Sequence, residues 1–220
     1  MNFKNIPYKT EWVEYPDIEA LCLKLGTLPT SKKNDGRPHY TLPVIYDPTT
    51  NTAVAESVEI VKYLDETYPE TPKLFPDGST ALQAAFYDFA WSAIRTPLLR
   101  IMLAPIHGVL TSRSAEYFRR TREEMFGKRL EELGREEDWT SLKTALTKVD
   151  SWLSENGPGN DLLMMGDRVS FVDLQLAAFI MWVRVVCRED SEQWKRIASW
   201  HGGRWQRLVE YFDKYATVDA

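Results

Sequence analysis

Cysteine is scarce in this chain, which has only Cys22 and Cys187 among its 220 residues. The two lie far apart, and neither has a CxxC partner or a histidine at metal-ligand spacing. Disulfide frameworks need several cysteines, and structural zinc sites need clustered cysteine and histidine. We therefore expect no disulfide framework and no metal site, and the composition fits a reducing cytoplasm.

Long apolar runs and excess positive charge are also missing. The longest apolar stretch, residues 171–186, is interrupted by Asp173, Gln175 and Arg184, too early for the roughly 20 apolar residues of a bilayer span. The first residues include Lys4 and lack the apolar core of a secretory signal. A net charge of -5 leaves no basic face for binding many phosphates. We expect no membrane and no nucleic-acid partner, and a small neutral or anionic ligand instead.

The first part of the chain alternates between strand and helix patterns. Residues 8–15 mix aromatic, β-branched and polar side chains in rough alternation, which predicts a strand. The apolar spacing that follows predicts a helix that Asp17 caps and Gly26 ends. Residues 27–40 form a long loop rich in lysine, glycine and proline. Long ordered loops of this kind often bind ligands.

A hairpin and a helix follow this loop. Residues 41–46 and 52–55 have strand composition, and the sequence DPTTN between them is a turn. The apolar residues from Val58 to Tyr68 share one helical face, and Pro69 stops that helix. The pattern predicts a strand, turn, strand and helix in direct succession.

Almost every segment after the linker-like residues 74–79 has helical period. We expect a long helix from Ser79 or Thr80 to Leu110, which Pro97 and Pro105 kink or end. Further helices are expected over residues 114–133 closed by Gly134, 140–156 closed by Gly157, 193–200 and 205–215. The linker therefore separates a mixed part from an all-helical part.

A strong helix start lies within GDRVSFVDL, residues 166–174. Ser170 and Asp173 can each satisfy the other's backbone donor, and Val169 and Leu174 occupy the positions of a hydrophobic staple. Such boxes stabilise any helix, so this one indicates little about function.

Two features of the first part suggest a binding site. Pro43 stands at the start of a β run, where it indicates either an edge strand or a bend with a cis peptide that exposes the backbone of Leu42. Glu56 and Ser57 sit where a strand meets a helix, so the helix end and the Ser57 hydroxyl can hold a carboxylate while Glu56 pairs with an ammonium group. The pair would clamp an amino acid, although Ser57 could also be a plain helix cap.

In this order and spacing, these segments resemble the glutathione transferase superfamily over nearly the whole chain. TLPVIYDPTTNTAVAES resembles the family's third and fourth strands and its glutathione-binding helix, and GDRVSFVDLQLAAF resembles the capping-box helix of its helical domain. FKNIPYKTEWVEYPDIEAL and SKKNDGRPHYTLP are similar to the fungal FuA class, which is related to bacterial β-aryl etherases. The resemblance implies an α+β fold, with a thioredoxin-like glutathione-binding domain over residues 1–72 and an all-helical domain with the acceptor site over residues 79–220.

The resemblance also implies site residues for glutathione as co-substrate. Leu42 would pair its backbone with the cysteinyl part just before a cis Pro43, and Glu56 and Ser57 would bind the γ-glutamyl end. The glycyl carboxylate would lie near three residues of the loop, His39, Tyr40 and Lys33.

The chain departs from the family pattern at its start. The family's thiol-activating residue sits at the junction of a first strand and helix, and here residues 1–6 match only the end of that helix. Completing the βαβ unit through Tyr15 takes about 30 residues, roughly twice what is present, so we expect an incomplete thioredoxin-like domain. Ser31, Cys22 and Tyr8 are alternatives within the chain, but Cys22 lies on an apolar helix face, where cysteines are usually inert, and no catalytic residue is assigned.

The reaction implied is attack of a glutathione thiolate on an aromatic electrophile, as in detoxification, with aryl ether cleavage as a specific form. Candidates for acceptor contacts lie on the first long helix, where aromatic residues usually belong to the core: Phe86, Tyr87, Phe89, Trp91 and Met102. Because no activating residue is assigned, we expect the 220-residue chain to bind better than it catalyses.

Two other functions stay open at this point. A ligandin-type carrier would bind glutathione or polyphenols without stabilising a thiolate. A transferase-like domain could also serve protein association, as in some translation factors. A hydrophobic aromatic small molecule is the expected second ligand, and a homodimer is a further option.

Overall fold

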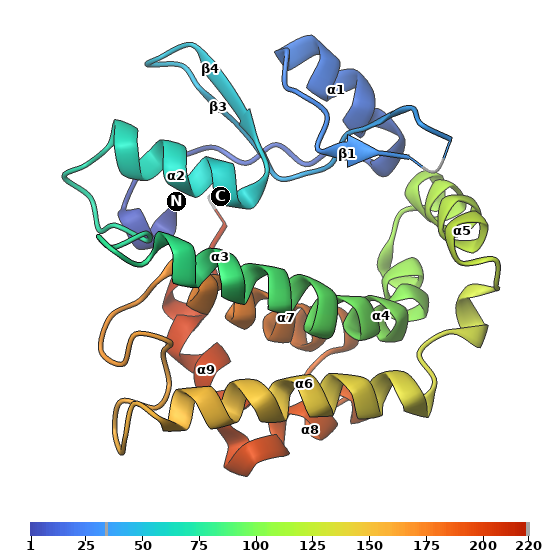
Figure 1. The fold of residues 1–220 in the computed structure, drawn as a ribbon. Coiled ribbons are helices and arrows are strands. Elements are labelled where there is room, and N and C mark those ends of the chain that lie inside the picture. Colours follow the sequence, from blue (N-terminus) through green and yellow to red (C-terminus); the bar gives the residue numbers. More distant parts are fainter. Residues whose placement is uncertain (34, 219–220) are drawn as a thin grey trace.

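The computed structural model describes residues 1–33 and 35–218. Figure 1 shows two small hairpins and helices α1 and α2 gathered at one end of the molecule, with the longer helices forming a bundle at the other end. Every strand of the described residues lies before residue 56, apart from an isolated bridge between Leu163 and Gly166. None of the described helices is long and apolar enough to cross a membrane.

The first part consists of short elements: η1 (Asn2–Lys4), η2 (Tyr15–Asp17), α1 (Ile18–Leu25), β1 (Ser31–Lys32), β2 (Pro38–His39), β3 (Val44–Asp47), β4 (Thr52–Ala55) and α2 (Ser57–Thr67). β1 pairs with β2 and β3 with β4, each pair antiparallel, so the sheets have two strands each. The predicted hairpin is confirmed, with Val44 opposite Ala55 and Asp47 opposite Thr52. Gly26 ends α1 with a left-handed backbone, as expected.

The strand predicted over residues 8–15 is wrong. A strand exists through its ladder partners, and no strand of the described residues pairs with this segment. Its polar groups instead bond to the helical part: Tyr8 Oη donates to the carbonyl of Thr217 over 2.9 Å, and Ser114 Oγ accepts from the Tyr15 amide over 3.0 Å.

Helices make up the second part: α3 (Thr80–Phe89), the π-helical segment η3 (Ala90–Arg95), α4 (Thr96–Val109), α5 (Ser112–Phe126), η4 (Leu130–Glu132), α6 (Glu136–Ser154), α7 (Phe171–Cys187), α8 (Glu192–Ala198), η5 (Trp200–Gly203), α9 (Arg204–Phe212) and η6 (Asp213–Tyr215). The long helix expected from Ser79 or Thr80 to Leu110 is present as the continuous run of α3, η3 and α4, with Pro97 just after the π segment and Pro105 inside α4. The end of the next helix differs from expectation. α5 ends at Gly127, whose φ is 63°, instead of Gly134.

One large apolar cluster fills the helical bundle. α4 lies at its centre and contacts α5, α6 and α7, and its Leu98, Met102 and Leu103 are fully buried. The capping box at the start of α7 is confirmed, because the Asp173 carboxylate accepts from the Ser170 amide over 2.8 Å. Burial raises the pKa of Asp173, while bonds from Ser170 and Met164 act in the opposite direction.

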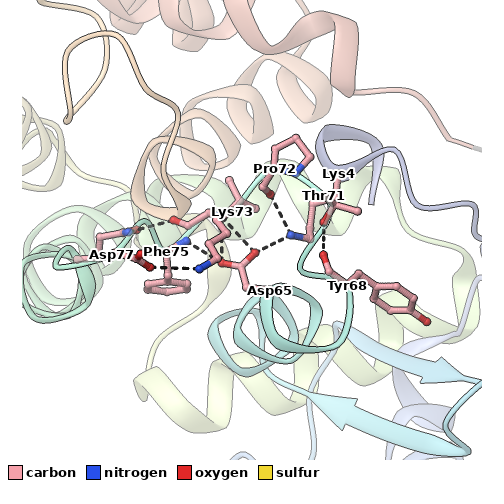
Figure 2. Close-up of polar contacts among 10 residues, drawn as sticks. Lys4, Asp65, Tyr68, Thr71, Pro72, Lys73, Phe75 and Asp77 are labelled. Carbon is pink, nitrogen blue, oxygen red and sulfur yellow. Dashed lines mark hydrogen bonds and ion pairs between the residues drawn. The ribbon is translucent and has the colours of Figure 1, made fainter.

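A buried ion pair fastens the two parts together at the linker. Figure 2 shows the Lys4 ammonium between the Asp65 carboxylate at the end of α2 and the carbonyl of Pro72, at 2.6 and 2.9 Å. The same carboxylate accepts from the amides of Leu74 and Phe75. The contacts hold the C-terminal end of α2 against the segment that leads into α3.

Candidate functional site

The position of α2 relative to the β3–β4 hairpin is set by Asp47. Its carboxylate accepts from the hydroxyls of Tyr63 on α2 and Tyr68 just after it, over 2.7 and 2.6 Å, and from the Thr49 amide over 2.9 Å. The Tyr68 and Tyr63 hydroxyls lower the pKa of Asp47 to about 2. These bonds tie the hairpin turn to the C-terminal end of α2. The first turn of α2 therefore keeps a fixed orientation where it follows β4.

Glu56, between β4 and α2, has an unusual backbone. Its φ of 74° and ψ of 127° lie outside the regions that non-glycine residues favour. Such conformations cost about 1–3 kcal/mol and gather at functional sites. The side chain is oriented as well, because Thr41 Oγ1 donates to Glu56 Oε1 over 3.1 Å. No cation pairs with this carboxylate among the described residues.

The first turn of α2 offers free donors. The amides of Ser57, Val58 and Glu59 and the Ser57 hydroxyl have no hydrogen-bond partner within residues 1–33 and 35–218. The capping interpretation of Ser57 is therefore not supported, because Glu56 holds the cap position and no side chain caps the helix. Free amides at a helix start attract a carboxylate.

Leu42 lies on the chain that leads into β3. The peptide bond between Leu42 and Pro43 is cis, one of the two alternatives that the sequence leaves open. Leu42 is 39% exposed, and its backbone N–H and C=O find no partner in the described part of the chain. Its backbone is therefore free to pair with an extended ligand.

The three loop candidates differ in whether their side chains already have a partner in the protein. Lys33 Nζ lies 2.8 Å from Glu19 Oε2 on α1, so this ammonium already has a carboxylate partner. His39 Nδ1 lies 3.1 Å from Ser31 Oγ. Burial and the charges of Arg122 and Lys33 lower the pKa of His39. Tyr40 is half-buried beside them in sequence.

The five candidates on the first long helix divide into two groups. Phe86 and Met102 are buried in the bundle and Phe89 is half-buried, and both phenylalanines pack on Trp152, at 6.1 and 4.8 Å between ring centroids. Tyr87 and Trp91 stack on each other at 5.7 Å. Burial raises the pKa of Tyr87, and the charge of Glu56 adds to the rise, which relates this pair to the start of α2.

Phe86 also lines a separate apolar cavity of about 380 Å³ with Leu82, Trp152, Met164 and Met165.

Cys22 is 1% exposed, in agreement with an inert core thiol. The described residues hold no cluster of His, Cys, Asp and Glu that could bind a metal ion.

Sequence reasoning missed three residues whose contacts appear only in the folded chain. Thr41 was included only as part of a strand, and its bond to Glu56 depends on the hairpin geometry. Arg95 and Arg122 lie on helical segments with other arginines nearby in sequence. No local pattern distinguishes these two arginines, because they differ from the other partly buried arginines only in having no acidic partner among the described residues.

Comparisons with known proteins agree with these features. The family model described as glutathione S-transferase, N-terminal domain, matches residues 1–72, and the model for the C-terminal domain matches residues 81–215. The glutathione S-transferase-like protein ustS of Aspergillus flavus is 32% identical over 225 aligned positions, which cover 94% of this chain and 78% of the relative.

Solved structures of the same fold are close matches. Glutathione transferase GSTFuA3 from Phanerochaete chrysosporium is 53% identical with a TM-score of 0.97, over 100% of this chain and 88% of that one. GSTFuA2 from the same organism is 52% identical with a TM-score of 0.96, over 99% and 88%. CsGST63524 of Ceriporiopsis subvermispora, solved in complex with glutathione, is 43% identical with a TM-score of 0.93, over 99% and 88%.

These matches confirm the expected fold, a thioredoxin-like N-terminal domain followed by a helical C-terminal domain. They also confirm the resemblance to the fungal FuA class. The chain belongs to the glutathione S-transferase family.

Proposed function

We propose that this chain binds glutathione with its γ-glutamyl end at Glu56 and Ser57 and its cysteinyl part on the backbone of Leu42. The observation that carries the proposal is the set of unpaired groups at these positions. The free amides of α2 and the Ser57 hydroxyl suit the α-carboxylate, and the Glu56 carboxylate, held by Thr41, suits the α-ammonium.

Leu42 and the loop before it offer binding positions for the cysteinyl and glycyl residues of glutathione. The free N–H and C=O of Leu42 suit the backbone of the cysteinyl residue. The glycyl carboxylate would then extend toward the loop that carries His39 and Tyr40. Lys33 is less suited to this role, since Glu19 already holds its ammonium group.

We propose transfer of glutathione to an aromatic electrophile as the reaction. The thiol loses its proton, the thiolate sulfur forms a bond to the electrophilic carbon, and the leaving group departs with the electron pair of the broken bond. For an aryl ether the bond broken is C–O and an aryloxide leaves. The catalytic residue stays unassigned. Tyr87 and Trp91 are the proposed acceptor contacts, because Trp91 is exposed, Tyr87 is half-buried and the two rings stack on each other.

A ligandin-type carrier is the second candidate function. The clamp at Glu56 and the aromatic pair at Trp91 would both be used, but no bond would form. The cavity of about 380 Å³ beside Phe86 favours this candidate, because it offers an apolar site away from the clamp. In either function the chain would work in a reducing compartment such as the cytoplasm, where Cys22 and Cys187 stay free.

Calorimetric titration of the chain tests the clamp directly. We expect glutathione to bind, and cysteinylglycine, which lacks the γ-glutamyl end, to bind at least about tenfold more weakly. Equal affinities for the two peptides would contradict the proposal. A spectrophotometric assay with an activated chloronitrobenzene then separates the two candidates, because an enzyme releases chloride in proportion to time and a carrier releases none above the uncatalysed rate.

A further inference from the structure

A chain of two threonine hydroxyls connects Glu56 with the β1–β2 hairpin. Thr41 Oγ1 lies 3.1 Å from Glu56 Oε1 and also 3.1 Å from Thr30 Oγ1. Thr30 Oγ1 in turn lies 3.1 Å from the carbonyl oxygen of His39. The residues come from separate segments, since Thr30 precedes β1, Thr41 precedes β3 and Glu56 precedes α2. The hydroxyl chain therefore exists only in the folded protein.

The number of hydroxyl protons sets the direction of this chain. The three contacts share two protons, one on each threonine, and an ionised carboxylate has none to give. The His39 carbonyl has a second donor, because the Thr30 amide donates to it over 2.9 Å. Thr30 can therefore turn its proton to Thr41 without leaving this carbonyl unpaired, and Thr41 then donates to Glu56. A bond to an ionised acceptor is about twice as strong as a neutral one and is reinforced by the bond behind it.

These bonds fix the Glu56 carboxylate while they leave its charge available. Both threonines are neutral donors and half-buried, and no cation pairs with Glu56 within residues 1–33 and 35–218. Thr41 contacts only Oε1, and Oε2 has no hydrogen-bond partner in the same part of the chain. A carboxylate accepts about four hydrogen bonds, so most of this capacity stays open to an ammonium group of a ligand.

The backbone on both sides of this contact is fixed as well. The Glu56 carbonyl accepts from the Ile60 amide over 2.8 Å, although the φ of Glu56 is 74°. A strained conformation of this kind persists only where the surrounding structure holds it. Thr41 directly precedes Leu42, whose backbone is the proposed partner of the cysteinyl residue. Thr41 therefore joins the two proposed binding positions, with its side chain on Glu56 and its backbone bonded to Leu42.

We propose that Thr41, held by Thr30, is a positioning residue that makes the site selective for peptides with a free α-amino group. The inference rests on the proposed function and specifies which group of the γ-glutamyl end Glu56 recognises. A carboxylate that is already oriented loses less side-chain entropy when an ammonium group binds. Without the hydroxyl the Glu56 carboxylate can rotate, so the preference for an ammonium group weakens while the α-carboxylate keeps its donors at Ser57.

Two peptides that differ only in the α-amino group test the inference. Glutaryl-cysteinylglycine keeps the α-carboxylate, thiol and glycyl end of glutathione and lacks the ammonium group. Calorimetric titration of the full chain should give at least about tenfold tighter binding of glutathione than of this analogue. Thr41→Val replaces the hydroxyl with a methyl group and should lower that ratio at least about threefold. The affinity for the analogue should stay within about twofold of the wild-type value.

Three further variants separate the hydroxyl from the rest of the side chain. Thr41→Ser restores the donor and should keep the wild-type ratio. Thr30→Val leaves Thr41 in place but removes the bond behind it, so it should lower the ratio by a smaller factor than Thr41→Val. Thr144→Val, at an exposed position on α6, is the matched control and should change neither affinity.

Each result supports or overturns the inference. A lower ratio in Thr41→Val, together with a wild-type ratio in Thr41→Ser, supports it. Equal losses of affinity for both peptides in Thr41→Val overturn it, because the hydroxyl would then hold the site as a whole. An unchanged ratio in Thr41→Val also overturns it, and an unchanged ratio in Thr30→Val overturns the part that includes Thr30.

Failure of the proposed function is distinguishable from failure of this inference. A wild-type chain that binds neither peptide contradicts the γ-glutamyl clamp together with the inference, whereas tight glutathione binding with an unchanged ratio in Thr41→Val contradicts the inference alone. If Thr41→Val does not fold, a crystal structure of the wild-type chain with glutathione decides the question. A Glu56 carboxylate that contacts both Thr41 Oγ1 and the α-ammonium nitrogen supports the inference, and a carboxylate turned away from Thr41 overturns it.

Discussion

Lys4 Nζ lies 2.6 Å from Asp65 Oδ1, with the lysine side chain 1% exposed and the aspartate 9% exposed. Removing one member of a buried ion pair leaves the other charge without compensation. We expect Lys4→Met to lower the free energy of unfolding by about 3–5 kcal/mol. Urea unfolding measures this change, with the exposed Lys9→Met as control, expected within about 0.5 kcal/mol of the wild type. A loss below about 1 kcal/mol for Lys4→Met would show that the pair does not secure the linker.

The Asp47 contacts should make stability depend on pH. The pKa of this carboxyl falls from 3.8 to about 2 in the folded state, first through the Tyr68 and Tyr63 hydroxyls. A lowered folded-state pKa means that the stabilisation is present above about pH 4 and is lost as the pH falls toward 2. The wild type should therefore be more stable than Asp47→Asn at pH 7, and the difference should shrink below pH 4. If the difference in unfolding free energy between the wild type and Asp47→Asn stays constant as the pH falls from 7 toward 2, the Asp47 contacts are not the source of a pH-dependent stability.

The start of α7 should depend on Asp173. Its carboxylate, 1% exposed, accepts from the Met164 amide at 2.7 Å and from the Ser170 amide and hydroxyl at 2.8 and 2.6 Å. Asp173→Ala leaves buried donors unsatisfied and should cost at least about 2 kcal/mol of unfolding free energy. Chemical denaturation is the measurement, and the exposed Asp190→Ala is the control. Equal effects of the two substitutions would mean that the box contributes nothing specific.

Trp91 should contribute to acceptor affinity and leave glutathione affinity unchanged. Its ring stacks on Tyr87, carries the Arg95 guanidinium at 4.1 Å and is still 43% exposed, so Trp91→Ala removes an exposed aromatic edge that an aromatic ligand can contact. We expect about two- to tenfold weaker binding of biphenylcarboxamide, a neutral aromatic amide used as the probe. Fluorescence titration gives this value, and Trp12→Ala, at a position 84% exposed and outside the stack, serves as control. If both variants bind the amide as the wild type does, the ligand does not lie on Trp91.

Local patterns explain what could be predicted from the sequence. The hairpin of β3 and β4, the capping box of α7 and the cis alternative at Pro43 each depend on a few neighbouring residues. In these places turn chemistry, capping and proline geometry specify the structure without help from distant parts of the chain.

Features that depend on distant residues were not predictable in this way. The alternation in residues 8–15 suits a strand, but the segment finds no ladder partner within the described part of the chain and bonds to α5 and Thr217 instead. The end of α5 at Gly127 was missed because both Gly127 and Gly134 follow helical patterns, and the turn η4 between them has its own start, where the Glu132 carboxylate accepts from the Arg129 amide over 2.9 Å.

Ion pairing on α5 shows the same limit. Arg119 and Arg122 lie three residues apart on this helix, and only the folded chain gives Arg119 the carboxylates of Glu123 and Glu131 while Arg122 has none among the residues that the structure describes.

Glutathione affinity of Ser57→Ala is the most direct measurement of the account's central claim, that the start of α2 binds the γ-glutamyl carboxylate. The substitution removes one free hydroxyl and leaves the helix cap unchanged, because Glu56 occupies the cap position. Calorimetric titration should show a loss of about 1.5–3 kcal/mol, or about ten- to a hundredfold in affinity, with Ser92→Ala as a control that binds like the wild type. Unchanged affinity in a normally folded Ser57→Ala variant would contradict the claim.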